Sequence, residues 1–142
     1  MRRIAEAGPR FAHRGSRTPL VAPDRHSGHN PPMTDSPYLF RATDHPLEAV
    51  NERLKVREAH SGFGIALRYQ ERAPDPHAPE PSWCETGHSI FILSGRIQYR
   101  FDSHTVEAGP GDMLHIPAGP THRHKPRAIG DEVVRYVLTE FG

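Results

Sequence analysis

The sequence predicts an all-β fold, a barrel or sandwich of short antiparallel strands with one short helix before it. Two observations lead to this prediction. Proline and glycine are abundant, at 15 and 12 of 142 residues, and such frequent chain breaks are typical of many short strands joined by turns. From Ser82 onward, apolar and polar residues alternate with a period of two in one short segment after another, which indicates half-buried strands.

The individual elements follow from local signals. Capping side chains and a proline at 43–46, followed by apolar residues at helical spacing, predict a helix over 46–54. A Ser-Gly pair at 61–62 predicts a turn, and the proline-rich stretch 73–81 predicts a loop. The predicted strands are 55–60, 63–72, 88–94, 96–101, 104–108, 113–116, 121–124 and 132–140.

The first part of the chain has a different composition from the rest. A length of 142 residues suits one hydrophobic core. Residues 1–37 lack any run that could bury a face, so we expect a disordered tail there and one domain over 38–142. Met33 begins the run MTDSPY, which is typical of an N-terminus. We hypothesise that the protein starts at Met33; a genuine tail is the alternative.

Charge and apolar content exclude several classes of partner. Residues 33–142 carry 12 basic and 15 acidic residues, so this part lacks the basic surface that nucleic-acid binding requires. The longest apolar run, Ile90–Leu93, is too short to span a membrane. The lone Cys84 allows no intramolecular disulfide. We therefore expect a cytoplasmic protein with no nucleic-acid or membrane partner.

The stretch GDMLHIPAGPTH at residues 111–122 has a distinctive skeleton, made of Gly111, Pro117, Gly119 and His122. Proline and glycine bend the chain where a strand ends, since ladder hydrogen bonds are not needed there. The next strand would then carry His122 inward. This skeleton resembles the second conserved motif of the cupin superfamily, although Pro126 stands where that motif has asparagine.

The first cupin motif is present in a variant form, within the block WCETGH at residues 83–88. Counting back from Gly95, His88 occupies the position of the family's glutamate, and the two usual histidines fall near Ser82 and Cys84. The resemblance covers about residues 82–140 well. It implies a double-stranded β-helix, which is a jelly-roll barrel, and frequent homodimers. It also implies a central pocket that often holds a divalent metal.

The resemblance implies that His122 is a metal ligand. His88 and His124 are expected to line the same cavity, because alternate residues of a strand share a face. Three imidazoles suit Zn, Fe, Mn or Ni, and Cys84 as a fourth ligand would favour Zn or Fe. Glu85 would restore a carboxylate if its loop turns inward. The alternative for Cys84 is a small buried residue without a metal role.

The pocket walls are expected to contact a small-molecule ligand. The candidate contact residues are Trp83, Glu85, Ile90, Ile92, Tyr99 and Phe101. Trp83 is as compatible with a place in the core as with the pocket, and the simplest role of Tyr99 and Phe101 is also in the core.

The sequence therefore predicts a metal-binding cupin that acts on a small organic molecule, as a dioxygenase, isomerase or decarboxylase. The broken first motif leaves an alternative, a metal-free ligand-binding or scaffold cupin without catalysis, because fold alone does not fix function. Whether the protein is an enzyme is left open. We also expect a homodimer, with the mildly apolar strand 63–69 as an edge that pairs with a second copy.

Overall fold

The computed structural model describes residues 36–142. The predicted tail and the proposed start at Met33 lie almost wholly outside the described residues, so the domain boundaries stay predictions. Within the described part, all strand pairings are antiparallel. The elements are β1 (Glu48–Ala49), β2 (Leu54–His60), β3 (Ala66–Arg72), β4 (Gly87–Ser94), β5 (Arg96–Arg100), β6 (Thr105–Ala108), β7 (Met113–Ile116), a 3₁₀ turn η1 (Pro120–His122), β8 (Lys125–Ile129) and β9 (Val134–Phe141).

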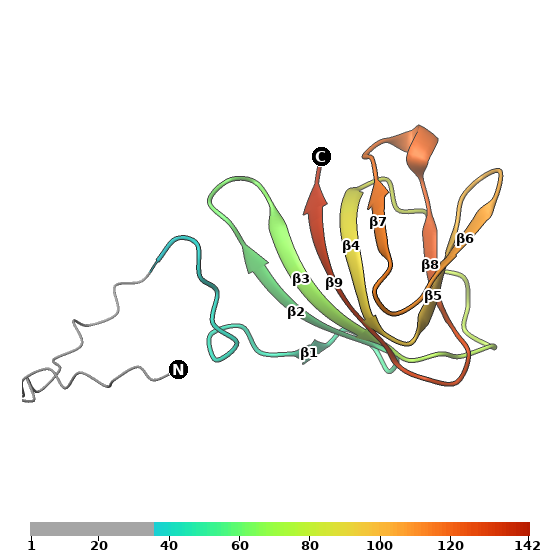
Figure 1. Ribbon diagram of the computed structural model, residues 1–142, viewed down its shortest axis with the longest axis horizontal. Coiled ribbons are helices and arrows are strands. Elements are labelled where there is room, and N and C mark those ends of the chain that lie inside the picture. Colours follow the sequence, from blue (N-terminus) through green and yellow to red (C-terminus); the bar gives the residue numbers. More distant parts are fainter. Residues whose placement is uncertain (1–35) are drawn as a thin grey trace, which may run out of the picture. The chain divides into compact units, whose positions relative to one another are not determined.

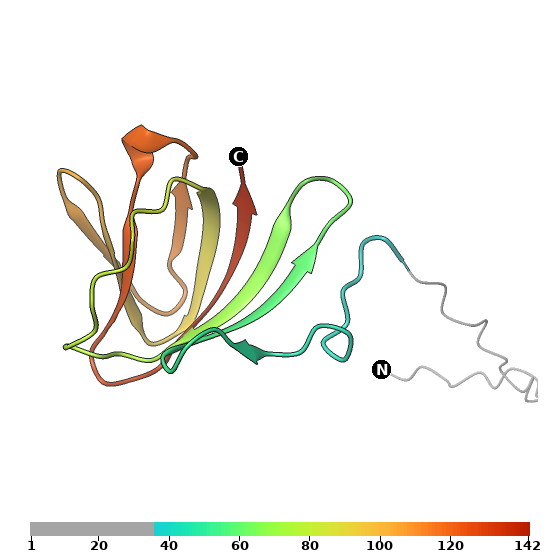
Figure 2. The same cartoon turned by 180° about the vertical axis from the view of Figure 1, so that it is seen from behind.

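The strands form two sheets that face each other (Figures 1 and 2). The larger sheet has the order β1-β2-β3-β9-β4-β7, and the smaller has the order β6-β5-β8. The last strand, β9, lies between β3 and β4, so the C-terminal segment joins the two halves of the larger sheet. The predicted all-β jelly-roll is confirmed. In the described part of the chain, no helix has the length and apolar character that a membrane span requires.

The core lies between the two sheets. Alternate residues of β4 face inward, and Ile90 and Ile92 on this strand are 3% and 0% exposed. Ile97 on β5 and Tyr136 on β9 pack against them from the opposite and neighbouring strands. This period-two burial is what the sequence alternation predicted. It also directs His88, the first inward residue of the same row, into the interior.

Gly95 is the single residue between β4 and β5, where the chain leaves one sheet for the other. Its φ of 73° lies in the left-handed region that side chains with a Cβ rarely adopt. A Cβ at this position would lie 2.8 Å from the carbonyl oxygen of Val133. Glycine is therefore required here both by the backbone conformation and by the close approach of the chain before β9.

The predicted helix over 46–54 is wrong. These residues form the short strand β1 and then a turn in which the Val50 amide donates to the Leu54 carbonyl at 2.8 Å. The side-chain oxygen of Asn51 accepts hydrogen bonds from the amides of Arg53 and Leu54, both at 2.9 Å. A short polar side chain that bonds the nearby backbone competes with helix formation. Val50, expected on the helix's apolar face, is 62% exposed.

The predicted strand over 121–124 is also misplaced. Residues Pro120–His122 form a 3₁₀ turn, and β8 begins only at Lys125. The turn closes with a hydrogen bond from the His122 amide to the Gly119 carbonyl at 3.1 Å. Gly119 has a φ of 116°, which lets the chain turn sharply before Pro120. Because of this turn, His124 is buried in the barrel and His122 is exposed.

Candidate metal centre

Three of the four predicted metal ligands, Cys84, His88 and His124, lie together in the interior. One ligand atom from each residue lies within 4.8 Å of the others. His88 comes from β4, whereas Cys84 and His124 face each other in an isolated antiparallel bridge. The bridge has two backbone hydrogen bonds, from the Cys84 amide to the His124 carbonyl at 2.9 Å and back at 3.0 Å. We call these three residues the metal cluster.

The ring orientations in the metal cluster are fixed by hydrogen bonds. The Nδ1 atom of His124 donates to the carbonyl oxygen of His122 at 3.1 Å. This bond places the proton on Nδ1 and leaves the Nε2 lone pair free, an arrangement common in metal-ligating histidines. The Sγ atom of Cys84 lies 3.4 Å from Nε2 of His88. The two imidazole rings are 5.0 Å apart and meet edge to face.

Burial keeps both histidines neutral at neutral pH. Desolvation, aided by repulsion from His124, lowers the pKa of His88 to about 4. Burial also lowers the pKa of His124, although its hydrogen bond to the His122 carbonyl opposes this effect. Metal ions bind neutral imidazole, so neither ring needs to lose a proton before binding at pH 7.

A carboxylate, that of Glu140 on β9, lies beside His88. Its Oε1 lies 3.8 Å from Nδ1 of His88 and 2.7 Å from Nη1 of Arg68. Burial raises the pKa of Glu140, and the charge of Arg68 acts against this rise. Nδ1 of His88 is buried without a hydrogen bond. Glu140 carries no signal in the sequence that points to this site, because only the pairing of β4 with β9 places it opposite His88.

His122 does not join the metal cluster. It lies exposed in the 3₁₀ turn, and its backbone carbonyl, not its imidazole, contacts His124. The expectation that His122 and His124 share a strand face fails because His122 precedes the strand. Glu85 is also exposed, and its backbone carbonyl accepts a hydrogen bond from the Gly119 amide at 2.8 Å. Its carboxylate therefore does not complete the donor set.

The predicted ligand-contact residues divide between core and surface. Ile90, Ile92 and Tyr99 are buried in the core, and Phe101 packs against it. The Tyr99 and Phe101 rings lie 5.8 and 6.0 Å from that of His124, so they form an apolar wall beside the metal cluster. These positions explain packing, and a role in ligand contact stays a prediction.

Trp83 is partly buried among cations. The Arg123 guanidinium lies 4.6 Å from the ring centroid and the Lys125 ammonium 4.7 Å, with Arg100 at 5.9 Å. Cations near an aromatic ring are attracted by its quadrupole. The residue thus holds the segment before Cys84 against β5 and β8. No ligand is needed to explain its position.

The sequence profile of the family described as the Cupin domain matches residues 70–140. This range contains all three residues of the metal cluster, the end of β3, β4 to β8 in full, and β9 except for its last residue. The comparison with curated proteins gives no match.

Solved structures with the same fold are numerous. A protein of unknown function from Rhizobium leguminosarum is 21% identical, with a TM-score of 0.57 over 72% of this chain and 94% of that one. The polyketide cyclase RemF from Streptomyces resistomycificus is 22% identical, with a TM-score of 0.56 over 72% and 77% of the two chains. The iron(II) form of HppE is 14% identical, with a TM-score of 0.59 over 72% and 59%.

Proposed function

Because this chain belongs to the cupin family, we propose that it binds a divalent metal ion through Cys84, His88 and His124 and uses the site on a small organic molecule. The observation that carries the proposal is the convergence of one sulfur and two imidazole ligand atoms within 4.8 Å of one another. Such a convergence of soft and borderline donors suits zinc or iron better than manganese.

The protonation states of the metal cluster, as well as the positions of its ligand atoms, suit a metal ion. Both imidazoles are held neutral by burial, and Nε2 of His124 is left as a lone-pair donor. A bound metal would draw the proton from the Cys84 thiol, as coordinating thiols are deprotonated. The half-buried pair of Glu140 and Arg68 beside His88 supplies a polar outer layer, the kind of support that orients metal ligands.

Three protein ligands leave a fourth position of a tetrahedral ion for water or for an oxygen atom of a small molecule. A metal there would act as a Lewis acid on that oxygen. Metal-dependent dioxygenases, isomerases and decarboxylases of the cupin family all need such an open position. The chain's own contribution is the apolar wall that Tyr99 and Phe101 form beside His124. The iron(II) in HppE supports the idea that this fold can hold a metal.

The test measures metal in protein purified without a histidine tag. We expect close to one equivalent of zinc or iron by elemental analysis, and a thiolate-to-cobalt charge-transfer band when cobalt(II) replaces the native ion. Cys84→Ser should remove the band, and His124→Gln should lose most of the metal. His77→Ala, which removes an exposed imidazole from a loop, serves as the matched control and should change neither readout.

A metal-free ligand-binding or scaffold cupin is the second candidate. One observation favours it: the Sγ atom of Cys84 lies 3.4 Å from Nε2 of His88, so the thiol and the imidazole can satisfy each other through a hydrogen bond. Under this alternative, the wild-type protein takes up none of Zn, Fe, Mn or Ni, and a chelator leaves its melting curve unchanged. That result would overturn the metal proposal.

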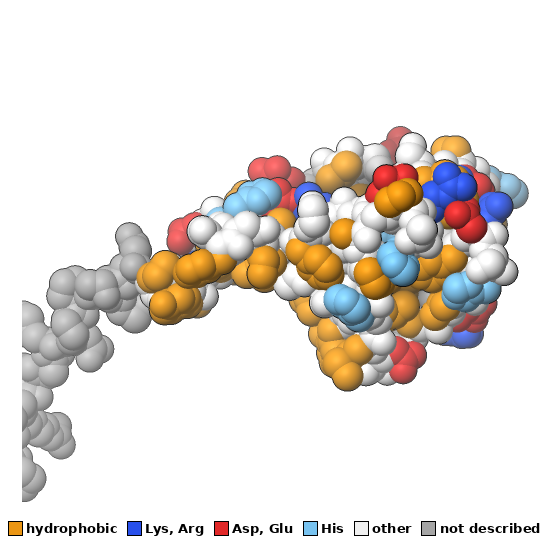
Figure 3. All heavy atoms as spheres, turned by 90° about the horizontal axis from the view of Figure 1, so that it is seen from above, with side chains coloured by type: hydrophobic (Ala, Val, Ile, Leu, Met, Phe, Trp, Pro, Cys, Tyr) orange, Lys and Arg blue, Asp and Glu red, His pale blue; other side chains and the backbone are white. Residues whose placement is uncertain are grey.

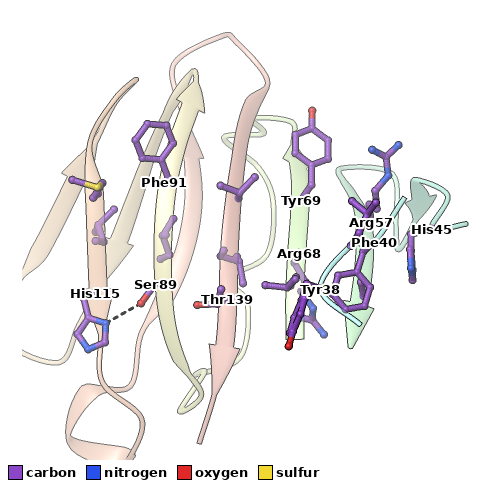
Figure 4. A pocket seen from close by; sticks show the side chains of 18 residues that line it. Tyr38, Phe40, His45, Arg57, Arg68, Tyr69, Ser89, Phe91, His115 and Thr139 are labelled. Atoms are coloured by element: carbon purple, nitrogen blue, oxygen red, sulfur yellow. Dashed lines mark hydrogen bonds between the residues drawn. The ribbon is translucent and has the colours of Figure 1, made fainter. Parts of the chain in front are cut away.

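We further propose that the protein is a homodimer, joined through the outer face of the larger sheet. Exposed hydrophobic side chains gather along one flank of the folded unit (Figure 3). On the outer face, one cross-strand row runs over β3, β9, β4 and β7 and consists of Tyr69, Val137, Phe91 and Met113. Figure 4 shows the side chains of Tyr69 and Phe91 along the groove on this face. The groove has a volume of ≈ 900 Å³.

A second copy is the partner that this face fits best. Contiguous apolar patches of this kind are uncommon on monomers, and Phe91, Met113 and Val137 are 39%, 77% and 39% exposed. A two-fold interface uses the same patch on both subunits, so one apolar face can bury its exposed side chains against the same face of a second copy. The predicted edge pairing through residues 63–69 is corrected, because β3 is paired on both sides, with β2 and β9.

A further inference from the structure

A polar cavity of ≈ 360 Å³ lies beside the loop that connects β3 to β4. We call it the loop cavity. The loop, drawn yellow-green in Figure 2, runs along the side of the barrel next to β8. The inner wall of the loop cavity consists of residues at the end of β3 and on β5 and β8. The outer wall of the cavity is the proline-rich stretch 73–82.

The loop cavity has an excess of positive charge. Five cationic side chains line it, namely Arg53, Arg72, Arg100, Lys125 and Arg127, whereas its acidic residues are Asp75 and Glu80. Glu80 is shared between Arg100 at 2.5 Å and Lys125 at 3.0 Å. Asp75 pairs with Arg53 at 2.7 Å. Both carboxylates are therefore already neutralised by cations, and two arginines remain.

Arg72 is one of these two arginines. Its Nε donates to the Tyr136 hydroxyl at 3.3 Å, and that hydroxyl donates to the buried Gln70 side chain at 2.6 Å. Tyr136 is 1% exposed, so the guanidinium is anchored by a fixed core residue. Among residues 36–142, no carboxylate forms an ion pair with Arg72. The remaining donors of its guanidinium are free to bind a ligand.

Arg127 on β8 is the second arginine of the loop cavity that, among the described residues, is not paired with a carboxylate. Its Nη2 donates to the backbone carbonyl of Pro76 at 3.0 Å, which ties the loop to the strand. Within the described part of the chain, it too has no carboxylate partner. A guanidinium has five N–H donors and stays charged at any physiological pH. Two guanidinium groups line one cavity, and each is held in place by a hydrogen bond to the protein. They favour a ligand that carries negatively charged oxygen atoms.

We propose that the loop cavity binds a small organic dianion through two carboxylate groups, with Arg72 and Arg127 as its charge partners. The planar fork of a guanidinium matches a carboxylate in a two-bond arrangement. The volume of ≈ 360 Å³ lies within the range of small-molecule sites. Ala73, Ala78 and the loop prolines provide apolar surface for a short carbon chain.

This site is separate from the metal cluster and does not rest on the proposed metal function. None of Cys84, His88 and His124 lines the loop cavity. The two sites are nevertheless neighbours in the chain, since Lys125 follows His124 and Ser82 lies two residues before Cys84.

The test is calorimetric titration of the full chain with succinate, both before and after treatment with a chelator. We expect succinate to bind in both samples, more weakly at high salt, and the uncharged succinamide not to bind. Arg127→Gln should weaken succinate binding about tenfold or more, because it removes charge-assisted hydrogen bonds. Arg72→Gln should act similarly. Arg96→Gln, which changes an exposed arginine on β5 outside the cavity, should leave binding unchanged.

Three results would overturn the proposal. The first is no binding of succinate at ~10 mM, a concentration that would nearly saturate a site with a Kd of about 1 mM. The second is equal loss in Arg96→Gln and Arg127→Gln. The third is binding of inorganic phosphate but not of succinate, which would exclude the carboxylate class. If Arg72→Gln fails to fold because Tyr136 loses its partner, Arg127→Gln alone decides.

Discussion

The Nδ1 atom of His124 lies 3.1 Å from the carbonyl oxygen of His122. The histidine that matches the family motif thus supports the metal cluster with its backbone, and the histidine two residues later supplies the imidazole. The 3₁₀ turn at Pro120–His122 produces this offset by delaying the start of β8.

His122→Ala should therefore retain bound metal, whereas His124→Ala should lose it. Alanine at residue 122 keeps the carbonyl oxygen that orients His124, and the lost side chain is exposed. Elemental analysis of the two purified variants, side by side with wild type, gives the answer. Loss of metal in His122→Ala with the fold intact would restore the motif histidine as the ligand.

The metal-free protein should lose stability as the pH falls from about 6.5 to about 4, through His88. The folded state holds His88 neutral, while the unfolded chain takes up a proton in this range, so acid favours unfolding. The pKa difference corresponds to about 3 kcal/mol at most. Urea unfolding at a series of pH values, with chelator present, measures the effect.

The comparison variant for this pH dependence is His88→Gln, which cannot titrate. Glu140 contributes in the opposite direction, because burial raises its pKa and the folded state binds its proton more tightly. Subtracting the variant's curve from that of wild type isolates His88. Parallel curves for the two proteins between pH 6.5 and 4 would contradict the assignment.

Gly95→Ala should destabilise the protein by more than about 2 kcal/mol, since the left-handed conformation alone costs about 1–2 kcal/mol with a Cβ. The added methyl would also collide with the backbone before β9, 2.8 Å from the Val133 carbonyl. Gly62→Ala, where nothing lies within 4 Å of the new Cβ, should change stability by no more than about 1 kcal/mol. Denaturant titration of both variants tests this difference.

Ile92→Ala should cost about 2–5 kcal/mol, as removal of a fully buried aliphatic side chain leaves a cavity. Ile92 is 0% exposed between the two sheets. Val50→Ala, at a residue 62% exposed, should stay within about 0.5 kcal/mol. The free energies of unfolding from urea titration should differ accordingly. Similar values for the two would show that the core is not packed around β4.

Val137→Glu should convert the proposed homodimer to a monomer. Val137 lies in the centre of the outer-face row and is 39% exposed, so the folded monomer can tolerate the carboxylate while the interface cannot. Sedimentation velocity at micromolar concentration reports the change in mass. Val50→Glu is the matched control and should remain dimeric. A wild-type monomer in the same experiment would refute the interface.

Periodicity predicted the fold well wherever one face of a strand is buried. The segments 88–94 and 113–116 are strands within one residue of their predicted bounds. The helix over 46–54 failed because the Asn51 side chain takes the amides that a helix would use. Helix propensity describes the local sequence only. Leu54, however, pairs with Arg72 of β3, a contact that the local sequence does not show.

The site was predictable in its residue types more than in its register. Cys84, His88 and His124 all carried metal predictions, but His122 was placed with them by the motif. A shift of the strand start by a few residues decides which side chain faces inward. Glu140 and the arginines of the loop cavity were beyond sequence reasoning, because contacts across strands far apart in sequence bring them together.

The bridge between Cys84 and His124 joins segments forty positions apart in the chain. A nascent polypeptide in which Cys84 and His88 have already left the ribosome still lacks its third donor. It acquires that donor only when the region around β8 leaves the ribosome and docks. If the three residues bind a metal as we propose, chains that stop before β8 lack one ligand and compete poorly for scarce ions.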